Sequence, residues 1–75
     1  MELEDLRIFV EVADAGGVSS AALRLGISKS MVSRRITRLE EQLGAQLFAR
    51  TTRGIALTEA GATFRDYAAR TSAEF

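Results

Sequence analysis

The 75-residue sequence contains no cysteine, no histidine and no proline. The absence of cysteine excludes disulfide bridges. The absence of both cysteine and histidine removes the commonest zinc ligands and the thiol and imidazole groups used in catalysis. Carboxylates, hydroxyls and one tyrosine remain, and they form no recognisable nucleophile–base pair. An enzyme is therefore the least favoured class of function, and we predict neither a cofactor nor a metal ion.

Long hydrophobic runs are also missing. No apolar stretch approaches the roughly 18 residues that a membrane-spanning helix needs. The N-terminus is acidic, unlike the basic and then apolar start of a secretory signal. We therefore expect a soluble, cytoplasmic protein. The chain is long enough for one domain, and because it buries only about 60–65% of its unfolded surface, contact with a partner would add to its stability.

The formal net charge is zero, but the charges are separated along the chain. Five acidic residues and one arginine lie in the first 15 positions. A basic strip at 24–38 can attract phosphate in spite of the zero net charge, because salt confines each field to about 8–10 Å. The alternative is that these charges simply cover solvated helix faces. The basic strip contains no acidic residue and consists of Arg24, Lys29, Arg34, Arg35 and Arg38.

Glycines and capping residues divide the first half of the chain into three predicted helices. Apolar residues at helical spacing predict a first helix that ends at the glycine pair 16–17. A second, short helix follows, with Ser19 as its predicted N-cap. The third helix is predicted over residues 28–43, between an N-cap at Ser28 and a terminating glycine at Gly44.

The second half of the chain predicts a hairpin and a fourth helix. Two apolar segments flank a polar stretch with Gly54 at its turn, which predicts a β-hairpin over residues 47–57. Thr58 is the predicted N-cap of a last helix that has no stop signal, so we expect the chain to be part of a longer protein. This order predicts a mainly α, winged helix-turn-helix fold, with the winged domain at 1–57 and a linker helix at 58–75.

Three small or apolar residues have the spacing of a helix-turn-helix. Ala22 allows two helices to approach closely, Gly26 tolerates the positive φ of the turn, and Val32 can lock the third helix onto the second. This spacing is only moderately specific, because many helical hairpins would satisfy it. We also expect one buried apolar stripe on the third helix, formed by Val32, Ile36, Leu39 and Leu43.

The opposite face of the third helix carries hydroxyls and arginines, where a purely structural helix more often mixes Glu, Lys and Gln. Hydroxyls can contact phosphates or base edges, and an arginine can bind guanine through two hydrogen bonds, worth about 1–3 kcal/mol of discrimination. The helix N-terminus adds backbone N–H groups for a phosphate. We therefore predict that this helix lies in the major groove of DNA; the alternative is an ordinary solvated surface. The predicted contacts are Ser28, Lys29, Ser30, Ser33, Arg34, Thr37 and Arg38.

Two arginines flank the turn of the predicted hairpin. Arg50 and Arg53 are placed to reach the neighbouring DNA backbone or minor groove when the hairpin lies beside the third helix. The alternative is that they only keep an exposed turn in water.

The last predicted helix has one apolar side. This side could pack back onto the domain, but Phe75 lies at the far end of a helix of about 25 Å, beyond the reach of so small a core. We therefore predict that the side pairs with the same helix of a second copy in a homodimer. The predicted dimerisation residues are Ala60, Phe64, Tyr67, Ala68, Thr71 and Phe75.

Four segments together resemble the N-terminal domain of LysR-type transcription regulators. The resemblance spans essentially the whole chain, in order and without gaps, and the combined set is far more specific than the helix-turn-helix spacing alone. The segments read Leu3-Glu-Asp-Leu-Arg-Ile-Phe, Ala21-Ala-Leu-Arg-Leu-Gly-Ile-Ser, Val32-Ser-Arg-Arg-Ile-Thr-Arg-Leu-Glu-Glu-Gln-Leu-Gly and Leu47-Phe-Ala-Arg-Thr-Thr-Arg-Gly-Ile-Ala-Leu-Thr-Glu-Ala-Gly.

The resemblance implies a homodimer that reads an interrupted inverted repeat, with the last helices paired antiparallel. It implies base and nearby phosphate contacts from the start of the third helix, backbone contacts from Thr37 and Arg38, and a wing contact from Arg53. Lys29 stands where the family usually has glutamine, which would change the preferred base or turn the contact into one with phosphate. Val18 stands where phenylalanine is common, which would loosen packing at the start of the second helix.

The resemblance also implies that a small-molecule effector binds a C-terminal domain that these 75 residues do not include. The alternative function is a winged helix that serves protein interaction or dimerisation without DNA readout, because a fold does not determine a function. Such modules typically lose the basic face that this sequence keeps.

Overall fold

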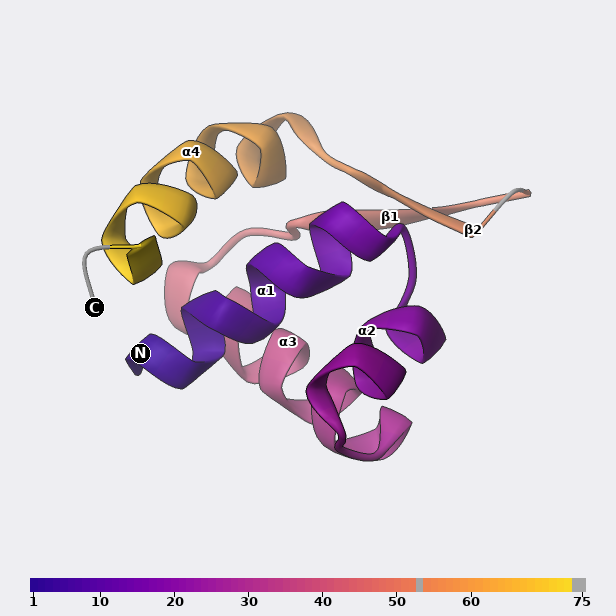
Figure 1. Ribbon diagram of the computed structural model, residues 1–75. Coiled ribbons are helices and arrows are strands. Elements are labelled where there is room, and N and C mark those ends of the chain that lie inside the picture. Colours follow the sequence, from indigo (N-terminus) through magenta and orange to yellow (C-terminus); the bar gives the residue numbers. More distant parts are fainter. Residues whose placement is uncertain (53, 74–75) are drawn as a thin grey trace.

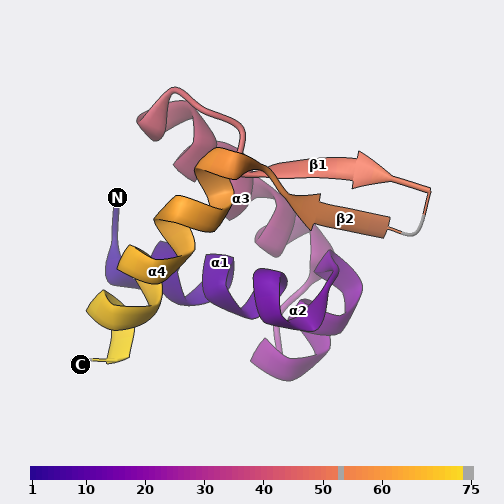
Figure 2. The same cartoon turned by 90° about the horizontal axis from the view of Figure 1, so that it is seen from above.

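The computed structural model describes residues 1–52 and 54–73, which form four helices and one two-stranded antiparallel sheet. Helix α1 contacts α2, α3 and α4, and the hairpin projects away from the helices (Figure 1, Figure 2). This order confirms the prediction of a mainly α winged helix. The elements are α1 (Leu3–Ala15), α2 (Val18–Leu25), α3 (Lys29–Leu43), β1 (Phe48–Thr51), β2 (Gly54–Leu57) and α4 (Glu59–Ala73).

The N-terminal caps of α3 and α4 are those that the sequence predicts. Ser28 Oγ accepts a hydrogen bond from the backbone N–H of Met31 at 3.1 Å. Thr58 Oγ1 accepts one from the backbone N–H of Gly61 at 2.9 Å. Each bond satisfies one of the N–H groups that the first turn of a helix leaves unpaired, so each defines where its helix begins.

The predicted cap of α2 at Ser19 is wrong. Helix α2 begins at Val18 and its N-cap is Gly17, which makes no side-chain capping bond. The carbonyl oxygen of Gly17 accepts from the backbone N–H of Ala21 at 3.2 Å, so the helical hydrogen bonds start before Ser19 is reached. Ser19 is instead an exposed residue within the first turn.

The helix-turn-helix spacing is confirmed at all three positions. Ala22 and Val32 are buried, and Gly26, between α2 and α3, has a φ of 70°. The N–H of Gly26 donates to the carbonyl of Ala22 at 2.9 Å, which ends α2 in a left-handed cap that favours glycine.

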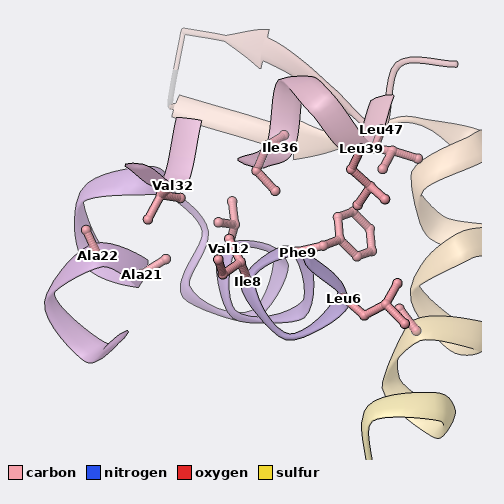
Figure 3. Packing of buried hydrophobic residues seen from close by; sticks show 11 residues of the cluster. Leu6, Ile8, Phe9, Val12, Ala21, Ala22, Val32, Ile36, Leu39 and Leu47 are labelled. Carbon is pink, nitrogen blue, oxygen red and sulfur yellow. The ribbon is translucent and has the colours of Figure 1, made fainter. Parts of the chain in front are cut away.

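Most of the buried apolar residues come from α1 and α3. Figure 3 shows the ring of Phe9 pointing from α1 toward Leu39 of α3. The same ring lies 5.2 Å from the ring of Phe48 and 5.4 Å from that of Phe64, measured between centroids. One fully buried side chain of α1 thus contacts α3, the hairpin and α4, and burial of such a side chain contributes about 1.5–3 kcal/mol. The buried apolar residues are Leu6, Ile8, Phe9, Val12, Ala21, Ala22, Val32, Ile36, Leu39, Leu47 and Ala68.

The buried stripe on α3 is one turn shorter than predicted. Val32, Ile36 and Leu39 are buried, but Leu43 is 37% exposed. Leu43 lies in the last turn of α3 and borders a surface groove against α4. The expectation that Leu43 is buried is therefore wrong, because the core does not extend along the whole of α3.

The connection between α3 and the hairpin is held by Glu40. Its Oε2 accepts hydrogen bonds from the backbone N–H groups of Leu47, at 2.7 Å, and Phe48, at 3.3 Å. A carboxylate that accepts two backbone N–H groups is a strong, directional attachment. Glu40 therefore sets where β1 leaves the end of α3.

The start of α4 lies very close to the same connection. A Cβ atom added at Gly61 would lie 2.1 Å from the carbonyl oxygen of Leu47. That oxygen also accepts from the backbone N–H of Thr58 at 3.0 Å, so it cannot move without loss of a hydrogen bond. Glycine is required at position 61 by this close approach of two backbones.

We predict that Gly61→Ala lowers the free energy of unfolding by about 2–4 kcal/mol, because the added methyl forces α4 away from the hairpin. Gly17→Ala is the matched control, since a Cβ there meets nothing within 4 Å, and its cost is expected to stay below about 1 kcal/mol. Urea unfolding followed by circular dichroism measures both. Equal effects of the two substitutions would contradict the close approach.

Candidate nucleic-acid interface

The polar face of α3 is exposed, opposite the residues that pack on α1. Arg34 extends from this face, and its Nε approaches the carbonyl of Ser30 at 3.5 Å. Its terminal nitrogens make no hydrogen bond to any described residue, so their donors point to solvent. Six residues predicted from the sequence to contact DNA are exposed on α3: Lys29, Ser30, Ser33, Arg34, Thr37 and Arg38.

The N-terminus of α3 is also open to solvent. Ser28 is exposed, and its hydroxyl oxygen is occupied as an acceptor by the N–H of Met31. The hydroxyl hydrogen remains available as a donor. Lys29 follows as the first helical residue, so a hydroxyl donor, an ammonium group and the positive end of the helix dipole lie close together.

A surface groove separates α3 from the hairpin. Ser33 and Thr37 line its α3 side, Arg50 of β1 lines its hairpin side, and Gln46 of the connection between them also borders it. Arg50 lies exposed on β1. Hydroxyls of α3 and a cation of the wing thus border one depression. Arg53, the second predicted wing residue, lies outside the described residues.

The largest difference from the predicted site is at Asp5, a fully buried acid on α1. Its carboxylate accepts hydrogen bonds from Arg35 Nη1 at 3.0 Å and from Arg38 Nη2 at 3.2 and 3.3 Å. The backbone N–H of Glu2 adds a bond at 3.2 Å, and the Glu2 carboxylate lies 3.6 Å from Arg38. Arg38, predicted from the sequence to contact the DNA backbone, is therefore held by two acidic side chains of the same chain.

Burial by itself raises the pKa of Asp5, but the hydrogen bonds from Arg35, Glu2 and Arg38 outweigh it and leave the pKa below its ordinary value. The sequence contains a signal for this residue that our sequence-based prediction did not use. Asp5 precedes Phe9 by four positions, so it lies on the buried face of an amphipathic helix. An acid on such a face needs cationic partners.

We predict that stability falls in acid because the pKa of Asp5 is lower in the folded than in the unfolded chain. Unfolded aspartate has a pKa of about 3.9, so the stabilisation is complete above that pH and is lost as the pH falls through the folded value. Asp5→Asn is expected to cost about 1–3 kcal/mol at neutral pH, less than for a fully buried pair because both arginines can return to water. This difference from the native chain should shrink below about pH 4.

Urea unfolding of the native chain and of Asp5→Asn at about pH 7, 5 and 3 tests this prediction. Glu4→Gln is the matched control, since it removes an exposed carboxylate of the same helical turn. Its effect should be smaller and nearly independent of pH. A difference between Asp5→Asn and the native chain that stays constant down to the lowest pH would contradict the assignment.

Two further ion pairs attach other helices to α1. Arg24 of α2 pairs with Glu11 at 3.2 Å, and Arg65 of α4 pairs with Asp14. The side chains of all four residues are between 30% and 59% exposed, so each pair adds little stability. Each pair neutralises a cation, Arg24 or Arg65, whose partner cannot be identified from the sequence.

The apolar side of α4 divides between the core and the surface. Ala68 is fully buried in the domain itself, and Phe64 is half-buried against Phe9, as in the alternative in which this helix packs back. Ala60 and Tyr67 are exposed and line an apolar groove that includes Leu43, Ala45 and Thr63. Thr71 is half-buried, and Phe75 lies outside the described residues.

Within residues 1–52 and 54–73, no group of three acidic side chains is placed to hold a metal ion. None of the described helices is long and apolar enough to cross a membrane. The candidate binding surfaces on the described residues are the polar face of α3, the groove beside the hairpin and the apolar groove on α4.

Residues 3–62 match the family described as "Bacterial regulatory helix-turn-helix protein, lysR family". The chain belongs to the lysR family. This match confirms the resemblance seen in the sequence. The protein named "HTH-type transcriptional regulator TfdT", from Cupriavidus pinatubonensis (strain JMP 134 / LMG 1197), is 50% identical to this lysR-family chain over 66 residues. That similarity covers 88% of this chain and 29% of TfdT, so the chain spans less than a third of this relative.

Two solved structures that resemble this lysR-family domain contain DNA. The BenM_DBD/benA site 1 DNA complex has a TM-score of 0.93 and 39% identity, and the similarity covers 99% of this chain and 86% of that one. The CbnR_DBD–DNA complex has a TM-score of 0.90 and 42% identity, with coverage of 95% and 82%. The arrangement of helices and wing is thus shared along nearly the whole chain.

Proposed function

We propose that this lysR-family domain is the DNA-binding part of a transcription regulator, with α3 in the major groove of its operator and the hairpin as a wing. The proposal rests on the exposed face of α3, which carries hydroxyls and the cations Lys29 and Arg34 and borders the groove between α3 and the hairpin. It is supported by the similarity to relatives named as transcriptional regulators and to two solved DNA complexes. This role places the protein in the cytoplasm, where bacterial DNA lies.

Contacts with bases come from the exposed residues at the start of α3. Arg34 has its terminal donors in solvent and can bind guanine through two hydrogen bonds. Lys29, Ser30 and Ser33 lie on the same exposed face. A 15-residue helix is about 22 Å long, which suits a rod that lies along a major groove about 12 Å wide.

Contacts with the DNA backbone come from residues around these. Ser28 offers its hydroxyl hydrogen beside the helix N-terminus, Thr37 lies one turn after Ser33, and Arg50 extends from the wing. Such contacts position the protein and add affinity without reading sequence. The predicted wing contact of Arg53 stays a prediction.

We predict that Arg34→Ala weakens binding to a selected operator about 5- to 100-fold, the range of one lost bidentate base contact, and weakens binding to random duplex much less. Fluorescence anisotropy with both duplexes measures the ratio. Arg70→Ala is the matched control, because it removes the same charge from the far end of α4. Equal losses of affinity on both duplexes would mean that Arg34 contacts only phosphate. No binding by the folded native chain at low salt would favour the interaction-module alternative.

A second copy of the chain is the proposed partner of the apolar groove on α4. Ala60 and Tyr67 are exposed, and together with Thr63, Phe64 and Leu43 they leave an apolar surface on a domain too small to cover it. Pairing of two α4 helices would present two α3 helices to the two halves of an inverted repeat. A small-molecule effector, in this proposal, binds outside these 75 residues.

We predict that Tyr67→Glu converts the dimer to a monomer, because a charge would be buried in the apolar contact between copies. Tyr67 is 48% exposed in the single domain, so the fold should tolerate the change. Ala62→Glu is the matched control, since Ala62 is exposed on α4 but does not line the groove. Sedimentation velocity measures the oligomeric state. Unchanged sedimentation of Tyr67→Glu, or equal dissociation of the control, would exclude this groove as the dimer contact.

A further inference from the structure

Most of the basic strip at residues 24–38 is already paired with acids of the same chain. Three of its five cations lie within 3.2 Å of a carboxylate oxygen: Arg24, Arg35 and Arg38. The other two, Lys29 and Arg34, form no ion pair with any residue that the structure describes. Both lie in the first two turns of α3, so the free positive charge of this helix is confined to one end.

The pairing of Arg35 and Arg38 differs from that of a surface ion pair. Asp5 is fully buried, and two arginines of α3 pair with it, at 3.0 and 3.2 Å. A phosphate that drew either arginine away would leave a buried carboxylate short of a partner, which is costly. An exposed pair such as Arg24 with Glu11 carries no such penalty.

The charges around this cluster also cancel. Arg35 and Arg38 face the carboxylates of Asp5 and Glu2, so two positive charges meet two negative ones. Glu41 lies next to Arg38 along one shallow surface depression and adds a further negative charge. The second half of α3 therefore presents little positive potential to a DNA backbone, although its sequence is rich in arginine.

We infer that Asp5 determines how far the DNA-contacting surface extends along α3, by withholding Arg35 and Arg38 from phosphates. Non-specific binding to DNA is essentially all electrostatic, whereas base contacts from Lys29 and Arg34 add to specific binding alone. Withholding these two cations thus lowers the affinity for DNA of any sequence and makes that affinity less dependent on salt. This inference rests on the proposed function, and it differs from the sequence-based expectation that Arg38 contacts the backbone.

The test compares the native chain with Asp5→Asn in anisotropy titrations on random duplex and on a selected operator, at several salt concentrations. Release of the two arginines should steepen the slope of log affinity against log salt on random duplex by about 1–2 for each protomer. Affinity for random duplex should rise on the order of tenfold near 0.1 M salt for each new phosphate contact, and affinity for the selected operator should rise by a similar factor, because phosphate contacts do not depend on sequence.

Glu4→Gln is the control for net charge, because it removes one negative charge from the same turn of α1 without a hydrogen bond to either arginine among the described residues. It should change the slope by less than about 0.5. If Glu4→Gln reproduces the effect of Asp5→Asn, the gain comes from overall charge and the inference is wrong. A shallower slope and weaker binding in Asp5→Asn would mean that Asp5 instead aims Arg38 at a phosphate, which also overturns it.

Arg38→Gln keeps the inference testable when Asp5→Asn is poorly folded. Arg38 is withheld from DNA in the native chain, so its loss should leave the salt slope on random duplex unchanged. In the Asp5→Asn background the same change should remove about one unit of slope. A loss of about one unit in the native background would overturn the inference. Absence of any DNA binding by the folded native chain would instead overturn the proposed function, and the inference with it.

Discussion

The burial of one carboxylate, that of Asp5, constrains the rest of this structure. A buried charge is costly unless it is paired, and among the described residues only Arg35 and Arg38 form ion pairs with it. Both are on α3, so the carboxylate fixes how α3 is rotated and shifted relative to α1. The rotation that brings them to Asp5 also turns Val32 into the core and Arg34 out to solvent. The orientation of the surface proposed for DNA thus depends on an ion-pair cluster at its edge.

Helix α1 also positions the hairpin and α4, the elements that flank α3. The ring of Phe9 contacts rings of both the hairpin and α4, and the Asp14–Arg65 pair joins α4 to the far end of α1. A chain of this size has no second core on which the wing or α4 could be held independently. The surface proposed for DNA and the surface proposed for a second copy therefore keep a fixed relative orientation. A dimer that binds two half-sites at a set spacing requires such an orientation.

Local patterns in the sequence predicted the elements well and the site in part. The caps at Ser28 and Thr58 and the turn at Gly26 were correct because each depends on contacts within a few residues. Ser19 was wrong because the helix begins two residues earlier than the capping preference indicates, with Gly17 as its N-cap. Leu43 was wrong because periodicity shows which side of a helix is apolar, and not how far its neighbour extends.

The sequence by itself determined the order of helices and hairpin, the family, and the polar face of α3, since these follow from spacing along one chain segment. Only the tertiary structure decided which cations are free. Asp5 meets Arg35 and Arg38 across 30 and 33 positions, and no local pattern records that contact. The same sequence of charges would allow Arg35 and Arg38 to be free or held, and the fold holds them because a buried carboxylate must keep its partners.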